Sequence, residues 1–281
     1  MSEAVKSVII AADGRRPIMK DAAEEFASSL ENRAEVCVVD VQDAGALDGA
    51  DCDILVVFGG DGSMLSAARN LNGSQVPVVG VNLGRFGFLT HYDAATVKED
   101  FESVLSGAVE LMKWMMISCS IKNGSEDACK GVALNDVVVG SGATSPMVAV
   151  ECHVNGEHAA TYRGDGVIVA SPAGSTAHSL SAGGPIVCSS MEALVLTPIC
   201  PHTLTNRPLV VPADSEIMLR ADGNACLTLD GRPGGELAVG DEVVVKKAPC
   251  TFNVVANNTR TYYGLLKDKL NWGRPPAYGK D

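Results

Sequence analysis

The sequence lacks the features of a membrane protein and of a nucleic-acid binder. No apolar run approaches the ~18 residues that a transmembrane helix needs, and Met1–Lys6 does not open a secretory signal. Basic residues are few, because 22 Lys and Arg stand against 34 Asp and Glu, a formal charge of −12. Binding to nucleic acid or anionic lipid needs a basic face. We therefore expect no partner of either kind.

The cysteines form no recognisable disulfide or zinc framework. There are nine, they are scattered singly, and no C-x-x-C occurs. An odd number at irregular spacing indicates reduced thiols and a cytoplasmic protein. Cys152-His153 and Cys200-Pro201-His202 have no second Cys/His pair at zinc-site spacing, so small buried side chains are the better interpretation.

Several catalytic motifs are also missing. The sequence has no G-x-S-x-G elbow and none of the HRD and DFG motifs of protein kinases. The stretch Gly273–Lys280 has five residues between its glycines where a P-loop has four. These absences exclude an ordinary serine hydrolase, a protein kinase and a P-loop enzyme.

The chain itself has 281 residues, 46% of them hydrophobic and 20% charged, which suits one large or two moderate globular domains. The first ~110 residues alternate short apolar runs with helical patterns. Ile54–Phe58 is such a run, and Ala23, Phe26, Ala27 and Leu30 share one face of a helix. This alternation predicts βαβ units and a parallel sheet covered on both faces.

The pattern changes near Leu111. From there to Val255 we predict mostly short strands, Val132–Val139 as one of them, with turns such as Pro233-Gly234-Gly235 between them. A last helix is expected within Tyr262–Trp272. The predicted organisation is an α/β domain over residues 1–110, an all-β domain over 111–255, and a C-terminal segment, 256–281.

The first polar motif is Gly59-Gly60-Asp61-Gly62-Ser63, directly after the strand Ile54–Phe58. Its glycines allow a backbone to approach a ligand closely, and the helix that follows would attract phosphate at its N-terminus. A carboxylate there repels phosphate, so Asp61 is wanted for a proton or a metal, or else it caps the helix.

Two weaker motifs come next along the chain. Asn82–Thr90 places two glycines after a strand, and a plain loop explains it as well as a binding loop. Asn135-Asp136 is costly to bury in an apolar region, so the pair either turns the chain or binds a polar group.

The longest motif, Tyr162–Pro185, contains five glycines, four serines and a threonine around one short strand. Small hydroxyl side chains and open backbone N–H groups suit a flat polar ligand such as a nucleotide. A short helix is expected within Thr176–Leu180. The alternative is a glycine-rich packing crossover.

Taken in order, these motifs resemble those of the NAD kinase family. Asp165–Pro185 is similar to the long signature of that family, and Gly59–Ser63 to its GGDG motif, which phosphofructokinases and lipid kinases share. Further matching blocks are Asn82–Thr90, Asn135-Asp136, Leu196–His202, Arg207-Pro208, Leu229–Gly231 and Lys269–Trp272. The resemblance covers about residues 54 to 273.

The resemblance implies a Rossmann-like N-terminal α/β domain, a C-terminal β-sandwich, and a C-terminal helix that packs back on the first domain. It implies phosphoryl transfer from ATP or polyphosphate to the 2′-hydroxyl of the NAD adenosine ribose, with Mg²⁺. The active site would lie between domains of a homodimer or homotetramer.

Roles for single residues follow from the same resemblance. Asp61 would accept the proton of the 2′-hydroxyl, and Gly60 and Gly62 would border the donor. The dinucleotide-binding residues would be Asn135, Asp136, Arg163, Asp165, Thr176, Ala177, His178, Ser181, Cys200 and Arg232. A carboxylate can orient a ribose hydroxyl and take its proton as the bond to phosphorus forms.

The sequence departs from the family at three positions: Ala173 stands for Thr or Ser, His178 for Tyr, and Arg232 for Gln. These bear on dinucleotide affinity. The competing hypotheses are a lipid or sugar kinase using the same GGDG turn, and a non-catalytic dinucleotide sensor. Donor choice, NAD against NADH, oligomer size, feedback by NADP(H) and metal ligands stay open.

Overall fold

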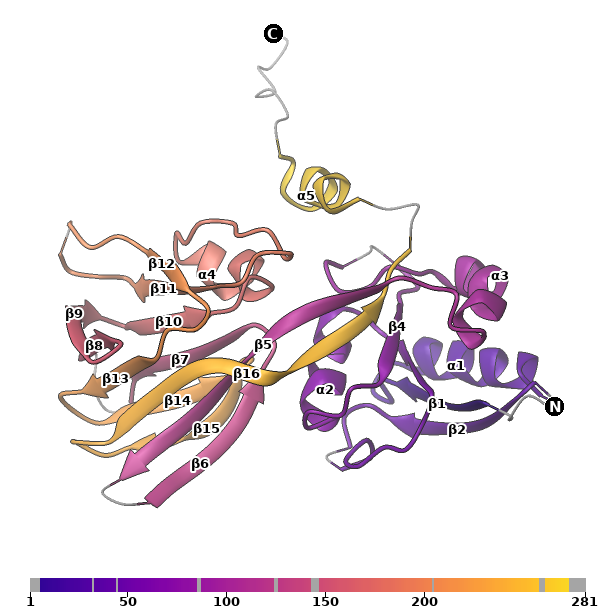
Figure 1. Ribbon diagram of the computed structural model, residues 1–281, viewed down its shortest axis with the longest axis horizontal. Helices are drawn as coiled ribbons and strands as arrows, with labels where there is room; N and C mark the ends of the chain where they lie inside the picture. The colour runs from indigo at the N-terminus through magenta and orange to yellow at the C-terminus, as the bar shows by residue number, and fades with distance from the viewer. Residues whose placement is uncertain are drawn as a thin grey trace, which may run out of the picture. The chain divides into compact units, whose positions relative to one another are not determined.

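The computed structural model divides the chain into two compact units (Figure 1). It describes residues 6–31, 33–43, 45–84, 87–123, 126–142, 147–203, 205–257 and 261–272, without the side chains of residues 123 and 126–130. The first unit comprises the chain up to Leu71, Val76–Met112 and the segment from Asn253 onward. The second comprises Asn72–Gln75 and Lys113–Phe252.

The first unit is an α/β structure built on parallel strands. Its sheet has the order β2-β1-β3-β4, and the last residues of β16 pair in parallel with β4. Its elements are β1 (Lys6–Ala12), α1 (Pro17–Ser29), β2 (Ala34–Asp40), β3 (Ile54–Phe58), α2 (Asp61–Asn70), β4 (Pro77–Val81), α3 (Ala94–Leu105) and α5 (Tyr262–Leu270).

Burial explains why β3 forms where the apolar run predicts it. All five of its residues are buried, as expected for a central parallel strand. Helices α1 and α3 contribute Phe26 and Phe101, whose rings meet edge to face at 4.9 Å between centroids, and Phe26 also packs on Phe58 of β3. The helices therefore supply the aromatic part of this core.

The second unit is built from two facing sheets. One has the order β12-β11-β10-β7-β14-β15, and the other contains β16-β13-β8-β9 with β5 and β6. Its elements are β5 (Leu111–Asn123), β6 (Glu126–Ala133), β7 (Asp136–Ser141), β8 (Val148–Val154), β9 (Glu157–Gly164), β10 (Gly166–Ala170), η1 (Gly174–Thr176), α4 (His178–Ser181), β11 (Ala193–Ile199), β12 (Leu209–Pro212), β13 (Ile217–Ala221), β14 (Ala225–Leu229), β15 (Arg232–Leu237) and β16 (Glu242–Val255).

One core joins the inner faces of these two sheets. Ile117 of β5 and Val243 of β16 pack in it with Val137, Val167 and Leu227 of the other sheet, and all five are fully buried. This is the packing of a β-sandwich. The predicted fold class, α/β followed by a β-rich sandwich, is confirmed.

Two local predictions are wrong. Val132–Val139 is not one strand, because the chain turns at Leu134-Asn135 between β6 and β7. Pro233-Gly234-Gly235 is not a turn but lies within β15, an edge strand, opposite a register shift between Leu227 and Thr228 of β14. An edge strand tolerates proline because one side of it lacks a partner.

The segment after β10 covers the outer face of the six-stranded sheet. Val187 and Ala182 pack there against Val138, Ile168 and Ala170. The short helix expected within Thr176–Leu180 exists as two pieces, η1 and α4, and α4 packs against β10 (Figure 1). None of the described helices has the length and apolarity to span a membrane.

Candidate active site

Asp61 is the first residue of α2 and follows β3 after two glycines. It therefore lies at the carboxyl end of a parallel strand, where open α/β sheets bind their ligands. Gly60 is the N-cap of α2, and no side chain caps this helix. The alternative that Asp61 caps α2 is thus wrong.

The carboxylate of Asp61 is held instead by the loop that follows β4. Its Oδ2 accepts from the backbone N–H of Phe88 at 2.9 Å, and its Oδ1 from that of Leu89 at 3.0 Å. The motif Asn82–Thr90 is therefore more than a plain loop. It brings two N–H donors to the Asp61 carboxylate of the motif before it.

Glycine is required at Gly87 for this approach. A Cβ there would collide with the carboxylate of Asp61, so any other residue would push it away. The loop is fixed in turn because Thr90 accepts from the N–H of Gly87 at 2.8 Å and is fully buried. The orientation of Asp61 is therefore determined before any ligand binds.

In the second unit, Asn135 and Asp136 form the turn into β7. The pair therefore turns the chain, which was one of the two interpretations open for it. Asp136 is only 4% exposed. Burial and, second, the negative charge of Asp230 raise the pKa of Asp136 to about 7. A buried carboxyl that titrates near neutrality is unusual and marks a candidate ligand site.

The start of the long motif packs directly on this turn. Ser171 donates its N–H to the carbonyl of Asn135 at 2.8 Å and its hydroxyl to the carbonyl of Leu134 at 2.5 Å. Gly174 lies against the backbone of Asn135, where a Cβ would collide with the carbonyl. Gly174 thus allows the turn after β10 to pack closely against the turn at Asn135.

The residues predicted for the adenosine pocket follow along η1 and α4. Thr176 and Ala177 are half-buried, while His178 and Ser181 are exposed. The Thr176 hydroxyl donates to the carbonyl of Ala173 at 3.0 Å. The structure thus brings Asn135 and Asp136 together with the beginning of this segment.

Arg163, Asp165 and Cys200 lie elsewhere, at the opposite end of β10. Register pairs Ala170 with Asp136 at one end of that strand and Gly166 with Ile199 at the other. Four residue steps at ~3.3 Å separate these ends by about 13 Å. The predicted dinucleotide residues therefore form two groups at opposite ends of one strand.

Cys200 belongs to the second of these groups. Its thiol is hydrogen-bonded to Asp165, and that bond, with the charge of the carboxylate, raises the pKa of Cys200. The Cys200 backbone has a φ of +44°. A thiol with a raised pKa is a weak nucleophile, so Cys200 suits contact rather than covalent chemistry.

Sequence reasoning missed Asp230 as a site residue. Its carboxylate accepts the backbone N–H groups of Leu134, Asn135 and Asp136 at 2.9, 2.7 and 3.0 Å. The Asp-Gly dipeptide at 230–231 is a turn signal that could have drawn attention to it. Arg232, two residues further on, is exposed at the start of β15.

The described residues include no group of three or more His, Cys, Asp or Glu side chains that could hold a metal ion. Both oxygens of Asp61 also already accept backbone N–H groups. The donor set thus fits no all-protein cage. A divalent cation would have to be held mainly by phosphate oxygens and water.

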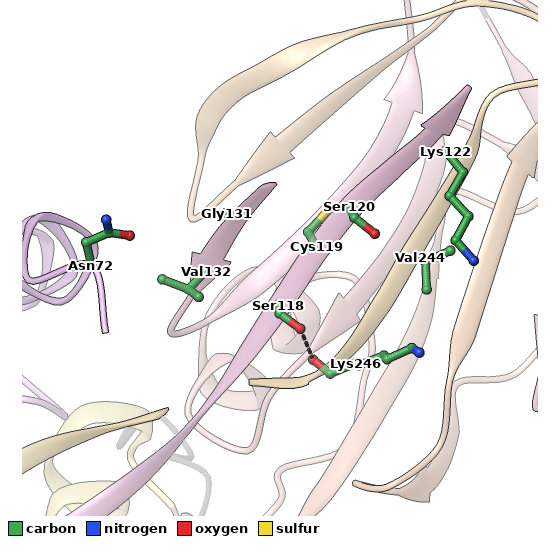
Figure 2. Close-up of a pocket in the computed structure, with 9 residues that line it drawn as sticks. All are labelled: Asn72, Ser118, Cys119, Ser120, Lys122, Gly131, Val132, Val244 and Lys246. Carbon is green, nitrogen blue, oxygen red and sulfur yellow. Dashed lines mark hydrogen bonds between the residues drawn. The ribbon is translucent and has the colours of Figure 1, made fainter. Parts of the chain in front are cut away.

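A pocket of about 450 Å³ lies elsewhere in the second unit (Figure 2). Ser118, Ser120 and Lys122 of β5 line it together with Val244 and Lys246 of β16, and the Ser118 hydroxyl donates to the carbonyl of Lys246 at 3.3 Å. None of the predicted site residues lines this pocket.

Comparison with known proteins agrees with these motifs. Residues 8–109 match the family model of the ATP-NAD kinase N-terminal domain, and residues 134–257 match that of the ATP-NAD kinase C-terminal domain. An NAD kinase of Geobacter sulfurreducens is 40% identical over 96% of this chain and 99% of its own. An NAD kinase of Aquifex aeolicus is 41% identical over 79% of this chain and 82% of its own.

Two solved structures are similar in fold. A yeast NADH kinase complexed with NADH has a TM-score of 0.88 at 26% identity, over 99% of this chain and 91% of its own. An NAD kinase from Archaeoglobus fulgidus in complex with ATP has a TM-score of 0.75 at 26% identity, over 93% of this chain and 98% of its own. By its motifs and these matches, the chain belongs to the NAD kinase family.

Proposed function

We propose that this chain phosphorylates NAD to NADP with ATP, and that Asp61 accepts the proton of the 2′-hydroxyl of the adenosine ribose. The observation that supports the role of Asp61 is the pair of N–H groups, of Phe88 and Leu89, that fix its carboxylate at the carboxyl end of β3. Family membership supports the overall reaction.

The geometry leaves Asp61 able to act as a base. Each carboxylate oxygen has two lone pairs, and one backbone N–H occupies a single one of them. A further lone pair can accept the ribose O–H. As the hydroxyl oxygen bonds to the transferred phosphorus, its proton moves to Asp61 and the phosphoryl leaves the donor oxygen. The fixed carboxylate contributes by alignment, since no reorientation is needed during the step.

The phosphoryl donor is assigned to the glycine turn and the N-terminus of α2. Gly60 is the N-cap of this helix and Gly62 lies in its first turn, where backbone N–H groups lack helical partners and attract phosphate. When bound with the donor, Mg²⁺ would neutralise charge on the phosphoryl group.

The dinucleotide is assigned to the second unit. Asn135 and Asp136 would take ribose or nicotinamide-side groups, and the η1–α4 segment would line the adenosine with Thr176, Ala177, His178 and Ser181. Arg163, Asp165 and Cys200 would contact the other end of the ligand, and Arg232 would favour its phosphates. The ~13 Å between the ends of β10 supports an elongated ligand with two nucleosides.

Three finer properties are part of the same proposal: a Mg²⁺ requirement, a cytoplasmic location, and assembly as a homodimer or homotetramer. Support for the metal comes from the chemistry of triphosphate transfer. Support for the location comes from the described cysteines, none of which forms a disulfide.

The direct test incubates the full chain with NAD or NADH, Mg²⁺, and ATP or polyphosphate, and detects the 2′-phosphorylated product enzymatically. Asp61→Asn should lower kcat by ~10²–10⁴-fold while NAD still binds. Asp40→Asn is the matched control, because Asp40 also ends a strand of this sheet and accepts two backbone N–H groups. Near-normal turnover by Asp61→Asn would refute the proposal that Asp61 accepts the proton of the 2′-hydroxyl. A wild-type chain that binds NAD without forming product would favour a dinucleotide sensor.

A further inference from the structure

One carboxylate organises the whole turn that carries Asn135 and Asp136. Asp230 Oδ1 accepts from the N–H groups of Asn135 and Asp136, and its Oδ2 accepts from that of Leu134. The N–H of Asp230 returns a bond to the carbonyl of Asp136 at 3.0 Å. Three successive N–H groups converging on one carboxylate form a rigid arrangement.

The opposite side of the turn is closed by Ser171. Its N–H and hydroxyl donate to the carbonyls of Asn135 and Leu134. Every backbone N–H and C=O of residues 134–136 is then bonded to Asp230 or Ser171. The backbone of this turn is therefore satisfied, and the side chains of Asn135 and Asp136 are left for a ligand.

Of the two side chains, that of Asp136 indicates a ligand more clearly, because it is a buried carboxyl. Only 4% of Asp136 is exposed. Burial and the charge of Asp230 both raise its pKa, and no hydrogen bond from a described residue to the carboxylate lowers it. A buried carboxyl without a donor is unfavourable unless a ligand hydroxyl or a proton completes it. Among the described residues no hydrogen bond lowers the pKa of Asp136, so a ligand hydroxyl or a proton would complete this carboxyl.

We propose that Asp230 is a positioning residue for the dinucleotide: it fixes the backbone of Leu134–Asp136 and so directs the side chains of Asn135 and Asp136 to the ligand. This inference rests on the proposed function only in that NAD is the ligand. Asp230 touches no reacting atom.

A second effect follows from the charge of Asp230. Burial is the larger cause of the raised pKa of Asp136, and the like charge of Asp230 adds to it, so Asp136 loses its proton only near pH 7. Among the described residues, Asp230 is the charged group that acts on the pKa of Asp136, and residues 170–176, which pack on the turn, carry no charge. Ionised Asp136 accepts a ribose hydroxyl more strongly than the neutral form does. Affinity for NAD should therefore rise as pH increases through about 7.

The test measures NAD affinity by calorimetry, without a phosphoryl donor, from pH 5.5 to 8.5. Asp230→Asn is the first variant, because Asn tolerates the φ of +47° at this position but gives up one acceptor oxygen and the charge. We expect about 10-fold weaker NAD binding at pH 8, a midpoint of the pH dependence moved to lower pH, and a KM for ATP within about 2-fold of wild type.

Asp241→Asn is the matched control. Asp241 sits in the turn between β15 and β16, where it accepts the N–H of Ala238 at 2.8 Å, and it contacts none of the site residues. It should leave both NAD affinity and the pH midpoint unchanged. Wild-type values in Asp230→Asn would overturn the proposal. The proposal would also be overturned if NAD affinity fell and the KM for ATP rose by the same factor while the pH midpoint of NAD binding stayed unchanged, since general destabilisation gives that result.

If Asp230→Asn does not fold, Asp230→Gly keeps the positive φ without strain and removes the carboxylate altogether. The wild type also offers a test, by ¹³C NMR of the Asp136 carboxyl. A midpoint near neutrality that moves to lower pH in the Asp230 variant supports the coupling, and an ordinary wild-type midpoint below about 5, or equal midpoints in the two proteins, overturns it. Because binding is measured without ATP, a chain that fails to make NADP would refute the proposed reaction and leave this test intact.

Discussion

Gly87 lies against the carboxylate of Asp61 so closely that a Cβ at this position would overlap it. The contact couples two motifs that are far apart in the sequence, because the same loop donates the N–H groups of Phe88 and Leu89 to Asp61. Small displacements of a catalytic carboxylate are costly to the reaction.

Gly87→Ala should therefore lower kcat by about 10²-fold, the effect expected for a misplacement of about 1 Å. The methyl group either displaces Asp61 or opens the loop, and both changes misdirect the base. Steady-state kinetics measures the loss, and circular dichroism checks the fold. Gly223→Ala is the control, since a Cβ at Gly223 meets open space. Unchanged kcat in Gly87→Ala would mean that the orientation of Asp61 is unimportant.

Asp136→Asn should change how stability depends on pH. The pKa of Asp136 is raised to about 7 in the folded chain from 3.8, so the folded state holds the extra proton between these values. Its contribution to stability is full below pH ~4 and is lost as pH rises towards 7, by up to ~4 kcal/mol. Asn removes this loss, so the variant should gain stability relative to wild type as pH rises from 4 to 8.

Urea denaturation at several pH values measures that difference. If the free energy of unfolding changed with pH in the same way for wild type and Asp136→Asn across this range, the raised pKa would be contradicted. Asp241→Asn again serves as the control, because it changes another turn aspartate in the same unit.

Gly174→Ala should weaken NAD binding and destabilise the second unit. A Cβ at Gly174 would collide with the backbone carbonyl of Asn135, which cannot move without breaking its bond from Ser171. Overpacking of this kind costs typically 1–3 kcal/mol. Thermal unfolding and NAD calorimetry report the two effects. A variant with wild-type values for both would show that the turn is more adaptable than its hydrogen bonds indicate.

Asp93→Ala tests the first unit without touching the site. Asp93 is the N-cap of α3 and forms a capping box with Thr96, accepting the N–H groups of Ala95 and Thr96. Its loss should cost ~1 kcal/mol of unfolding free energy and leave kcat unchanged. Ser106→Ala at the other end of the helix is the control, and equal stability of the two variants would contradict a role for the cap.

The sequence predicts buried elements better than exposed ones, for a physical reason. β3 has the bounds that its apolar run suggests, because a central parallel strand needs no polar alternation. β9 was missed, since its exposed residues from Glu157 to Ala159 give no apolar signal. Pro233-Gly234-Gly235 predicts a turn within β15, because proline and glycine are rare in strands and the sequence does not reveal that this strand lies at a sheet edge.

The site shows the same division. The motif order identifies the family, and Asp61 stands out by its chemistry alone. Asp230 does not, because it acts on Leu134–Asp136 across 94 to 96 positions of sequence, and only the folded register brings the two turns together. Long-range positioning of this kind leaves no local pattern to read.

The pairing of β16 with β4 has a consequence for synthesis on the ribosome. Asn253 and Val254 complete the parallel sheet of the first unit opposite Pro77 and Val78. Domains made early in translation usually fold first. Here the sheet of the first unit is completed only by residues that follow the second unit, because every strand of that unit up to Phe252 has emerged before them. Nascent chains stalled before Asn253 should therefore expose an open edge at β4, a surface that chaperones would have to shield.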